Sequence, residues 1–117
     1  MSLAAYQRVR ELAETPRATE YRLLGDVTGE MVTAWERGQR GAALMPALHR
    51  NREMWSTFAA VCGSAGNSLP DALRASIISI SLWVDRFTSE VIAGREPLDP
   101  LLEVNRAVRE GLAGERA

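Results

Sequence analysis

The sequence has few of the residue types on which enzyme chemistry depends. Its 117 residues include one histidine and one cysteine, His49 and Cys62, thirteen positions apart. No spaced carboxylate supplies a third member, so a Cys–His catalytic pair is not indicated. Metal sites need several Cys and His ligands or regularly spaced acidic residues, and neither pattern is present. We therefore expect no enzyme activity, no cofactor and no metal site.

Long apolar runs and an excess of one charge are also missing. The formal net charge is -1, which provides no overall field to attract nucleic acid or anionic lipid. No uncharged segment reaches the ~20 residues that a membrane span requires, and the N-terminus lacks the pattern of a signal peptide. A lone cysteine cannot form an internal disulfide, so nothing calls for an oxidising compartment. We expect a cytoplasmic protein.

The residues that are present predict a small helical domain. The hydrophobic fraction is 46% and the charged fraction is 25%, as in soluble globular proteins. Proline and glycine divide the chain into about five helical segments with no strand between them. We expect an all-α, single-domain bundle over residues 1–117. Its helices should cover residues 2–13, 15–37, 46–63 and 69–92, and a final segment that begins at Asp99-Pro100.

The segment 69–92 carries the strongest pattern. Apolar residues recur there at alternating steps of four and three, which predicts one continuous core stripe. Ile78 and Leu82 lie outside that stripe, so the helix should be packed from both sides, by its own chain or by another protein. We expect it to be the central and most buried helix. The expected core residues are Leu73, Ile77, Ile80, Val84, Phe87, Trp55 and Val108.

Each of the other long helices has one apolar face that includes a polar residue. Two of these polar residues are asparagines: Asn51 lies among Leu48, Trp55, Phe58 and Cys62, and Asn105 lies among Leu98, Leu101 or Leu102, Val108 and Leu112. The face of the second helix is Tyr21, Leu24, Thr28, Met31 and Trp35. That helix also contains Gly25 and Gly29, which should each cost roughly 0.5–1 kcal/mol relative to alanine. We favour a locally soft helix; the alternative is close approach of another backbone.

A local basic cluster surrounds the predicted loop at residues 38–41. It could contact an anion or RNA, or it could be an ordinary solvated turn balanced by Glu36 and Glu53. The second interpretation is favoured because isolated exposed charges are common and contribute little. The residues of the cluster are Arg37, Arg40, His49, Arg50 and Arg52.

Five segments, taken together and in this order, are similar to a known family. They are MSLAAYQ, TPRATEYRLL, NREMWSTFA, LPDALRASIISISLWVDRFTSEV and LDPLLEVNRAVREGL, and they span nearly the whole chain. The chain resembles FlaF, the flagellar biosynthesis regulator of alphaproteobacteria. The resemblance implies a small, cytoplasmic, non-enzymatic helical protein that promotes flagellin synthesis. It implies action with FlbT, a regulator of flagellin messenger RNA, and a chaperone-like or adaptor link to flagellin itself.

The resemblance supplies no motif for a binding site, so candidate positions come from the helical patterns. We expect partner contacts at Tyr6 and Val9 of the first helix, Tyr21 and Leu24 of the second, and Ile78 and Leu82 of the segment 69–92. The favoured mode is packing of a partner helix in a groove. The alternative is direct binding of flagellin mRNA through the basic cluster, and self-association is also open.

Overall fold

The computed structural model describes residues 2–5, 16–64 and 69–116, and this part of the chain contains helices and no strand. The all-α prediction is confirmed. Residues 3–5 are helical, and Ser2 Oγ accepts a hydrogen bond from the Ala5 backbone N–H at 3.1 Å, as expected of the N-cap. The rest of the first predicted helix lies outside the described residues. The other elements are α2 (Pro16–Glu36), the 3₁₀ helix η1 (Gly41–Leu44), α3 (Met45–Cys62), α4 (Asp71–Ile92) and α5 (Asp99–Arg116).

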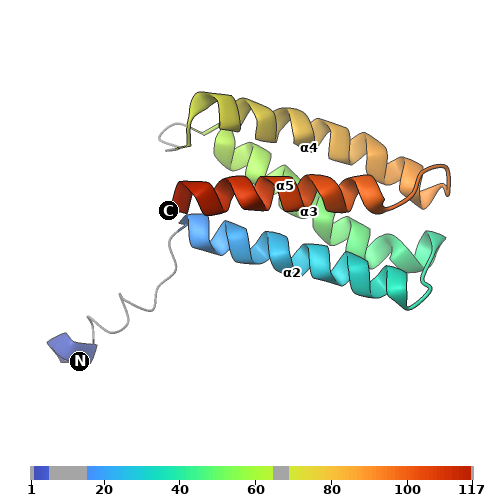
Figure 1. Cartoon of the computed structure of the whole chain (residues 1–117), viewed down its shortest axis with the longest axis horizontal. Coiled ribbons are helices and arrows are strands. Elements are labelled where there is room, and N and C mark those ends of the chain that lie inside the picture. The colour runs from blue at the N-terminus through green and yellow to red at the C-terminus, as the bar shows by residue number, and fades with distance from the viewer. Residues whose placement is uncertain (1, 6–15, 65–68, 117) are drawn as a thin grey trace.

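The four long helices form two pairs (Figure 1). α2 lies along α5, and α3 lies along α4. α3 also contacts α2, whereas α2 and α4 do not touch, so they occupy opposite sides of the bundle. The short helix η1, which replaces part of the predicted loop, contacts α2, α3 and α4 at one end of the bundle. Leu44 of η1 is buried and anchors this end.

Glycines terminate α2 and α4 in the same way. Gly94, predicted to end its helix, has a φ of +75°, and Gly38 has a φ of +79°. After α4, Arg95 N–H donates to Glu90 C=O at 2.9 Å, and Gly94 N–H donates to Val91 C=O at 3.0 Å. The same pair of bonds follows α2. These are Schellman ends, which need a residue tolerant of positive φ.

The prediction that segment 69–92 is the central and most buried helix is wrong. Of its predicted core residues, Ile77 and Val84 are buried, but Leu73, Ile80 and Phe87 are only partly buried. α3 takes the central place because it has α4 on one side and α2 on the other. Its predicted face is buried throughout, and Trp55 is fully buried; Val108 of α5 is buried as well. An apolar stripe therefore identified a packed helix but not its place in the bundle.

The two asparagines predicted on apolar faces meet inside the core. Asn105 of α5 and Asn51 of α3 are both fully buried. Trp55 Nε1 donates to Asn105 Oδ1 at 2.8 Å, and Asn105 Nδ2 donates to Thr28 Oγ1 at 3.0 Å and to Asn51 Oδ1 at 2.8 Å. One amide thus joins α2, α3 and α5. We call these four residues the Asn105 network.

The donor character of tryptophan fixes the direction of this network. An indole N–H can only donate, so Asn105 must present its oxygen to Trp55 and its amide hydrogens to Thr28 and Asn51. Asn51 must then accept with Oδ1, and its own Nδ2 is buried without a hydrogen-bond partner. An unpaired buried amide costs free energy, so the network stabilises one arrangement of helices at the expense of this group.

Gly25 leaves room for a side chain of α5. A Cβ at this position would lie 2.8 Å from Arg109 Nη2. Arg109 Nε donates to Tyr21 C=O at 3.1 Å, and its guanidinium lies 4.0 Å from the centre of the Tyr21 ring. The approach of another backbone, the less favoured interpretation of Gly25, is not what the structure shows, because a side chain of α5 makes the close approach instead. Gly29, four residues later, has nothing within 4 Å of a built Cβ.

Matched truncations test the Asn105 network. Asn105→Ala should destabilise the fold by about 3–5 kcal/mol, because it leaves Trp55, Thr28 and Asn51 without their buried partner. Asn51→Ala creates a similar cavity but removes an amide that already lacks one partner, so it should cost about 1–2 kcal/mol less. Urea unfolding of both variants measures the difference. Equal midpoints would contradict the central role of Asn105.

Matched glycine substitutions test the Arg109 contact. Gly29→Ala should raise the free energy of unfolding by about 0.5–1 kcal/mol through helix propensity alone. Gly25→Ala should lack this gain, because the methyl group displaces Arg109 from Tyr21. Thermal unfolding measures both, and in an Arg109→Ala background the two substitutions should give the same gain. A full gain from Gly25→Ala in the wild-type chain would refute the contact.

Candidate functional site

The structure does not assemble a reactive site from the residues it describes. His49 is exposed on α3, with Nε2 3.0 Å from Glu53 Oε1, whereas Cys62 is buried at the end of the same helix. Thirteen residues of one helix keep them about 20 Å apart. Over the described ranges, no group of three or more His, Cys, Asp and Glu residues could hold a metal ion. Within the same ranges, no helix has the length and apolar character needed to cross a bilayer.

The predicted basic cluster is divided among three parts of the structure. Arg50 forms an ion pair with Glu30 of α2. Arg52 turns the other way, toward α4: Nη2 donates to Ser89 Oγ at 2.9 Å, and Nε lies 3.0 Å from Asp85 Oδ1 as an ion pair without hydrogen-bond geometry. These guanidiniums tie α3 to its two neighbours, so they do not form one anion-binding surface.

Arg40 caps the end of α2. Its guanidinium lies 3.2 Å from the centre of the Trp35 ring, and Nη1 donates to Trp35 C=O at 3.0 Å. This places a cation at the negative end of the helix dipole. Arg95 has a comparable position after α4, where its hydrogen bond to Glu90 lowers the pKa of that carboxyl below its usual range. Both arginines therefore stabilise helix ends.

An exposed apolar pair lies on α4. Ile78 is 37% exposed and Leu82 is 61% exposed, and their spacing of four residues places them one above the other on the helix surface. They lie outside the face that packs on α3, as the sequence pattern predicted. We call Ile78 and Leu82 the α4 edge. Covering these two adjacent apolar side chains with a protein partner would remove apolar surface from water.

The other candidate partner-binding residues have different positions. Leu24 is fully buried in the core, so it cannot contact a partner in this structure. Tyr21 is partly buried and lies against Arg109, which gives its ring a structural role. Tyr6 and Val9 lie outside the described residues.

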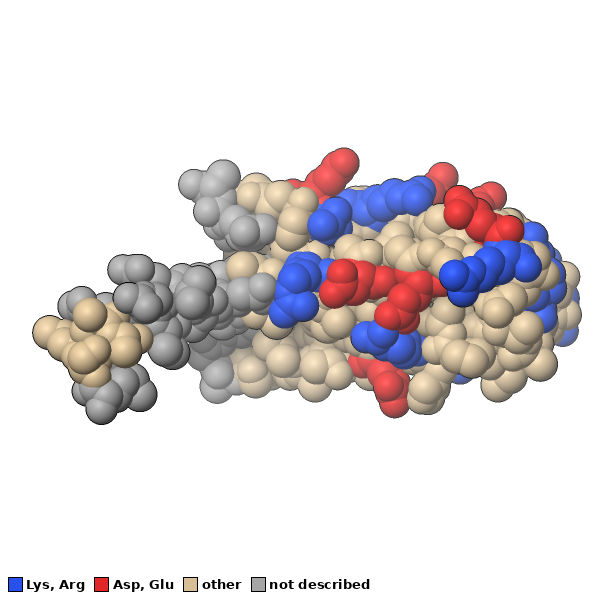
Figure 2. All heavy atoms as spheres, turned by 90° about the horizontal axis from the view of Figure 1, so that it is seen from below, with Lys and Arg blue, Asp and Glu red and all other residues tan. Residues whose placement is uncertain are grey.

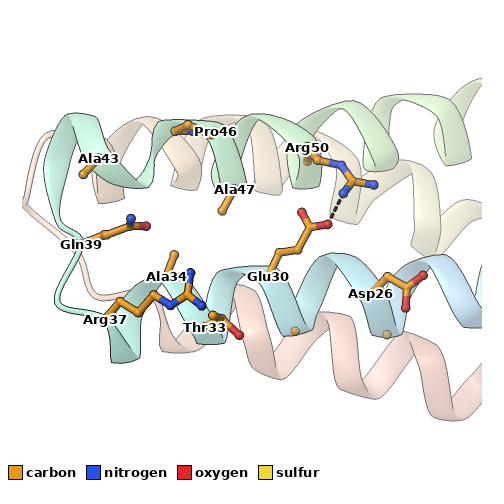
Figure 3. Close-up of a pocket in the computed structure, with 12 residues that line it drawn as sticks. Asp26, Glu30, Thr33, Ala34, Arg37, Gln39, Ala43, Pro46, Ala47 and Arg50 are labelled. Atoms are coloured by element: carbon orange, nitrogen blue, oxygen red, sulfur yellow. Dashed lines mark hydrogen bonds and ion pairs between the residues drawn. The ribbon is translucent and has the colours of Figure 1, made fainter.

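A groove that the sequence did not predict runs between α2 and α3 (Figure 3). Its volume is about 810 Å³. Figure 3 shows Glu30 and Arg50 pointing toward each other across it, with Gln39 extending from the loop. We call it the α2–α3 groove. It is lined by Gly25, Asp26, Gly29, Glu30, Thr33, Ala34, Arg37, Gln39, Ala43, Pro46, Ala47 and Arg50.

The charged residues that line this groove are of both signs: Asp26 and Glu30 are acidic, and Arg37 and Arg50 are basic. Figure 2 shows acidic and basic side chains interspersed on the face seen from below, with no large area of one sign. Such a surface favours a partner with complementary charges of both signs over a polyanion.

A family model described as "Flagellar protein FlaF" matches residues 2–112. The chain belongs to the FlaF family. This confirms the resemblance seen in the sequence and establishes a flagellar protein. No curated protein and no solved structure matches the chain significantly. The family therefore gives the functional context, and the surfaces described above give the candidate contacts.

Sequence reasoning found the α4 edge of this FlaF-family chain but missed the α2–α3 groove. The signal for the groove was present in Gly25 and Gly29, which share a helix face, and in the small residues Ala43 and Ala47. Whether these small residues form a groove depends on the distance between α2 and α3. A tertiary distance of this kind cannot be read from one helix.

The arginine contacts predict different outcomes for two neighbouring positions. Arg40→Ala should lower the free energy of unfolding by about 1 kcal/mol, because it removes a cation–π contact and a charged cap. Arg37→Ala should change it by less than about 0.5 kcal/mol, as for most exposed charges. Thermal unfolding of the two variants at one salt concentration measures this. Equal effects would show that the Arg40 contact with Trp35 adds no stability.

Proposed function

We propose that this chain is a non-enzymatic regulator of flagellin synthesis and flagellum assembly that binds FlbT, flagellin or both as an adaptor or chaperone. The observation that carries the proposal is the α4 edge, where Ile78 and Leu82 are exposed side by side in a member of a flagellar family. Their burial against a partner would release water from apolar surface, which is the main driving force of association.

The position of the α4 edge also supports a contact with another protein. α4 packs on α3 through its opposite face, and Arg52 anchors it there through Asp85 and Ser89. The edge is therefore presented on a rigid helix whose place does not depend on the partner. A preorganised surface loses little conformational entropy on binding.

Direct binding of flagellin mRNA remains the alternative function. It would need several arginines on one surface, because affinity for RNA comes largely from phosphate contacts. Arg50 and Arg52 instead form ion pairs with different helices, and Arg40 lies against Trp35. We therefore favour the protein partner. Strong, salt-dependent binding of the mRNA by the purified chain alone would reverse this preference.

Substitutions at the α4 edge test the proposal. The double variant Ile78→Asp with Leu82→Asp should weaken binding to FlbT or flagellin by about 1–3 kcal/mol or more, as loss of an interface hot spot does. Its fold should survive because both side chains are outside the core stripe. The measurement is calorimetric titration of the purified chain with each partner.

Met45→Asp provides the matched control. Met45 is 47% exposed at the start of α3, where an acidic residue favours the helix dipole. This variant should bind as the wild type does. If the double variant also bound both partners with wild-type affinity, the α4 edge would not be an interface. If the wild type bound neither protein, the proposed partners would be wrong.

A further inference from the structure

The molecular surface is hollowed on both sides of α2, where two depressions meet. The α2–α3 groove has a volume of about 810 Å³, and a second hollow of about 340 Å³ lies between α2 and α5. Gly25, Gly29 and Thr33 line both of them. A Cβ at Gly29 would meet nothing within 4 Å. The backbone of α2 is therefore exposed to a close neighbour between the two hollows.

The shape of the α2–α3 groove suits a helix. Between Asp26 and Arg37, eleven residues of α2 give it a length of about 16 Å, or about three helical turns. The Glu30–Arg50 ion pair crosses the groove between these ends (Figure 3), so an occupant would lie above that pair. Its floor consists of small residues, Ala34, Ala43 and Ala47, beside Pro46. Small residues at a contact allow two helices to approach more closely than the usual 8–10 Å. An occupant with small or aliphatic side chains on one face would fill it.

The charges specify the flanks of that occupant. Asp26 lies toward one end of the groove and Arg37 toward the other, where no ion pair with a described residue engages Arg37. Asp26 is only loosely paired, with Oδ2 3.7 Å from Arg22 Nη1 and both side chains more than half exposed. A basic residue near Asp26 and an acidic residue near Arg37, about three turns away, would complement these ends.

A second copy of the chain fits this surface poorly. In a two-fold dimer, each α2 could enter the groove of the other copy only if the two α2 helices were displaced sideways from each other. A two-fold axis that runs along the helices produces this displacement, and it makes the two α2 helices parallel. Each residue would then face its own equivalent, so Asp26 would oppose Asp26 and Arg37 would oppose Arg37. Like charges at an interface disfavour association. An antiparallel contact would bring Asp26 of one copy near Arg37 of the other. It would, however, place the two α2 helices directly opposite each other and leave both grooves unfilled.

We infer that the α2–α3 groove is a second docking surface, which binds an amphipathic helix of a flagellar partner protein with a basic residue near one end and an acidic residue near the other. This inference rests on the proposed function for the kind of partner and adds the place and chemistry of the contact. α2 and α4 lie on opposite sides of the bundle (Figure 1). The groove and the α4 edge can therefore be occupied at the same time, as an adaptor requires.

Filling the groove tests the inference. Gly29→Met places a flexible side chain in the open space above α2, and methionine is a better helix former than glycine, so the fold should persist. Purified flagellin and purified FlbT are the probes, each titrated calorimetrically into the full-length variant. We expect affinity for one of them to fall at least about tenfold, because the side chain excludes the partner helix.

Two further variants separate groove binding from other effects. Gly111→Met on α5 is the matched control, since Gly111 is also exposed and has nothing within 4 Å of a built Cβ; it should bind both probes as the wild type does. Arg37→Glu should weaken binding of the same probe as Gly29→Met, without any change in the groove's shape. The Ile78→Asp, Leu82→Asp variant should keep wild-type affinity for the probe whose binding Gly29→Met weakens.

The outcomes are distinct. Wild-type affinity of Gly29→Met and Arg37→Glu for both probes would overturn the groove while leaving the proposed function intact. A wild-type dimer in sedimentation equilibrium that Gly29→Met dissociates would show that the occupant is a second copy and would also overturn the inference. If the wild type bound neither probe, the proposed function would fail, and the groove assignment would fail with it.

Discussion

The buried amide of Asn105 is the constraint on which the arrangement of the helices depends. It accepts from Trp55 of α3 and donates to Asn51 of α3 and Thr28 of α2. Hydrophobic burial alone would allow these helices to slide or rotate at small cost, because apolar contacts have little direction. Hydrogen bonds in a dry core have strict geometry, and a wrong alignment would leave several groups unpaired. The network therefore selects one register of α2, α3 and α5.

The packing of α2 on α5 also determines which residues of α2 remain exposed at the surface. Arg109 occupies the space above Gly25 and lies on Tyr21, which places the other glycine, Gly29, at the surface. On the other side, α3 packs against α2 and is joined to it by the Arg50–Glu30 ion pair, and the two helices leave the α2–α3 groove between them at the surface. α2 thus packs against both α5 and α3, but its surface between the two hollows stays exposed. The packing of the core determines this exposed surface of α2, and the proposed docking of a partner helix uses it.

The two candidate surfaces differ in physical character. The α4 edge consists of two exposed aliphatic side chains on a helix, so it suits a partner with an apolar hollow. The α2–α3 groove is concave and has small residues on its floor and mixed charges at its rim, so it selects a helix by shape and charge. The two surfaces share α3, which lines the groove and supports α4 from the other side. This arrangement is compatible with the proposed adaptor function.

The sequence by itself determined the helices α2, α3, α4 and α5, most of their ends and much of the faces that they bury. Gly94 predicted a helix end because few other residues adopt positive φ, and Asn51 stood out as the one polar residue on the apolar face of its helix, while Asn105 fell on the apolar face of the last helix. Helical periodicity and backbone sterics are local properties, so they can be inferred from the sequence of a single segment. The tertiary structure alone decided that α3 and not α4 is central, that the two asparagines meet, that the basic cluster is divided, and that Gly25 and Gly29 have different roles. These features depend on distances between helices far apart in the chain, which no periodic pattern within one helix encodes.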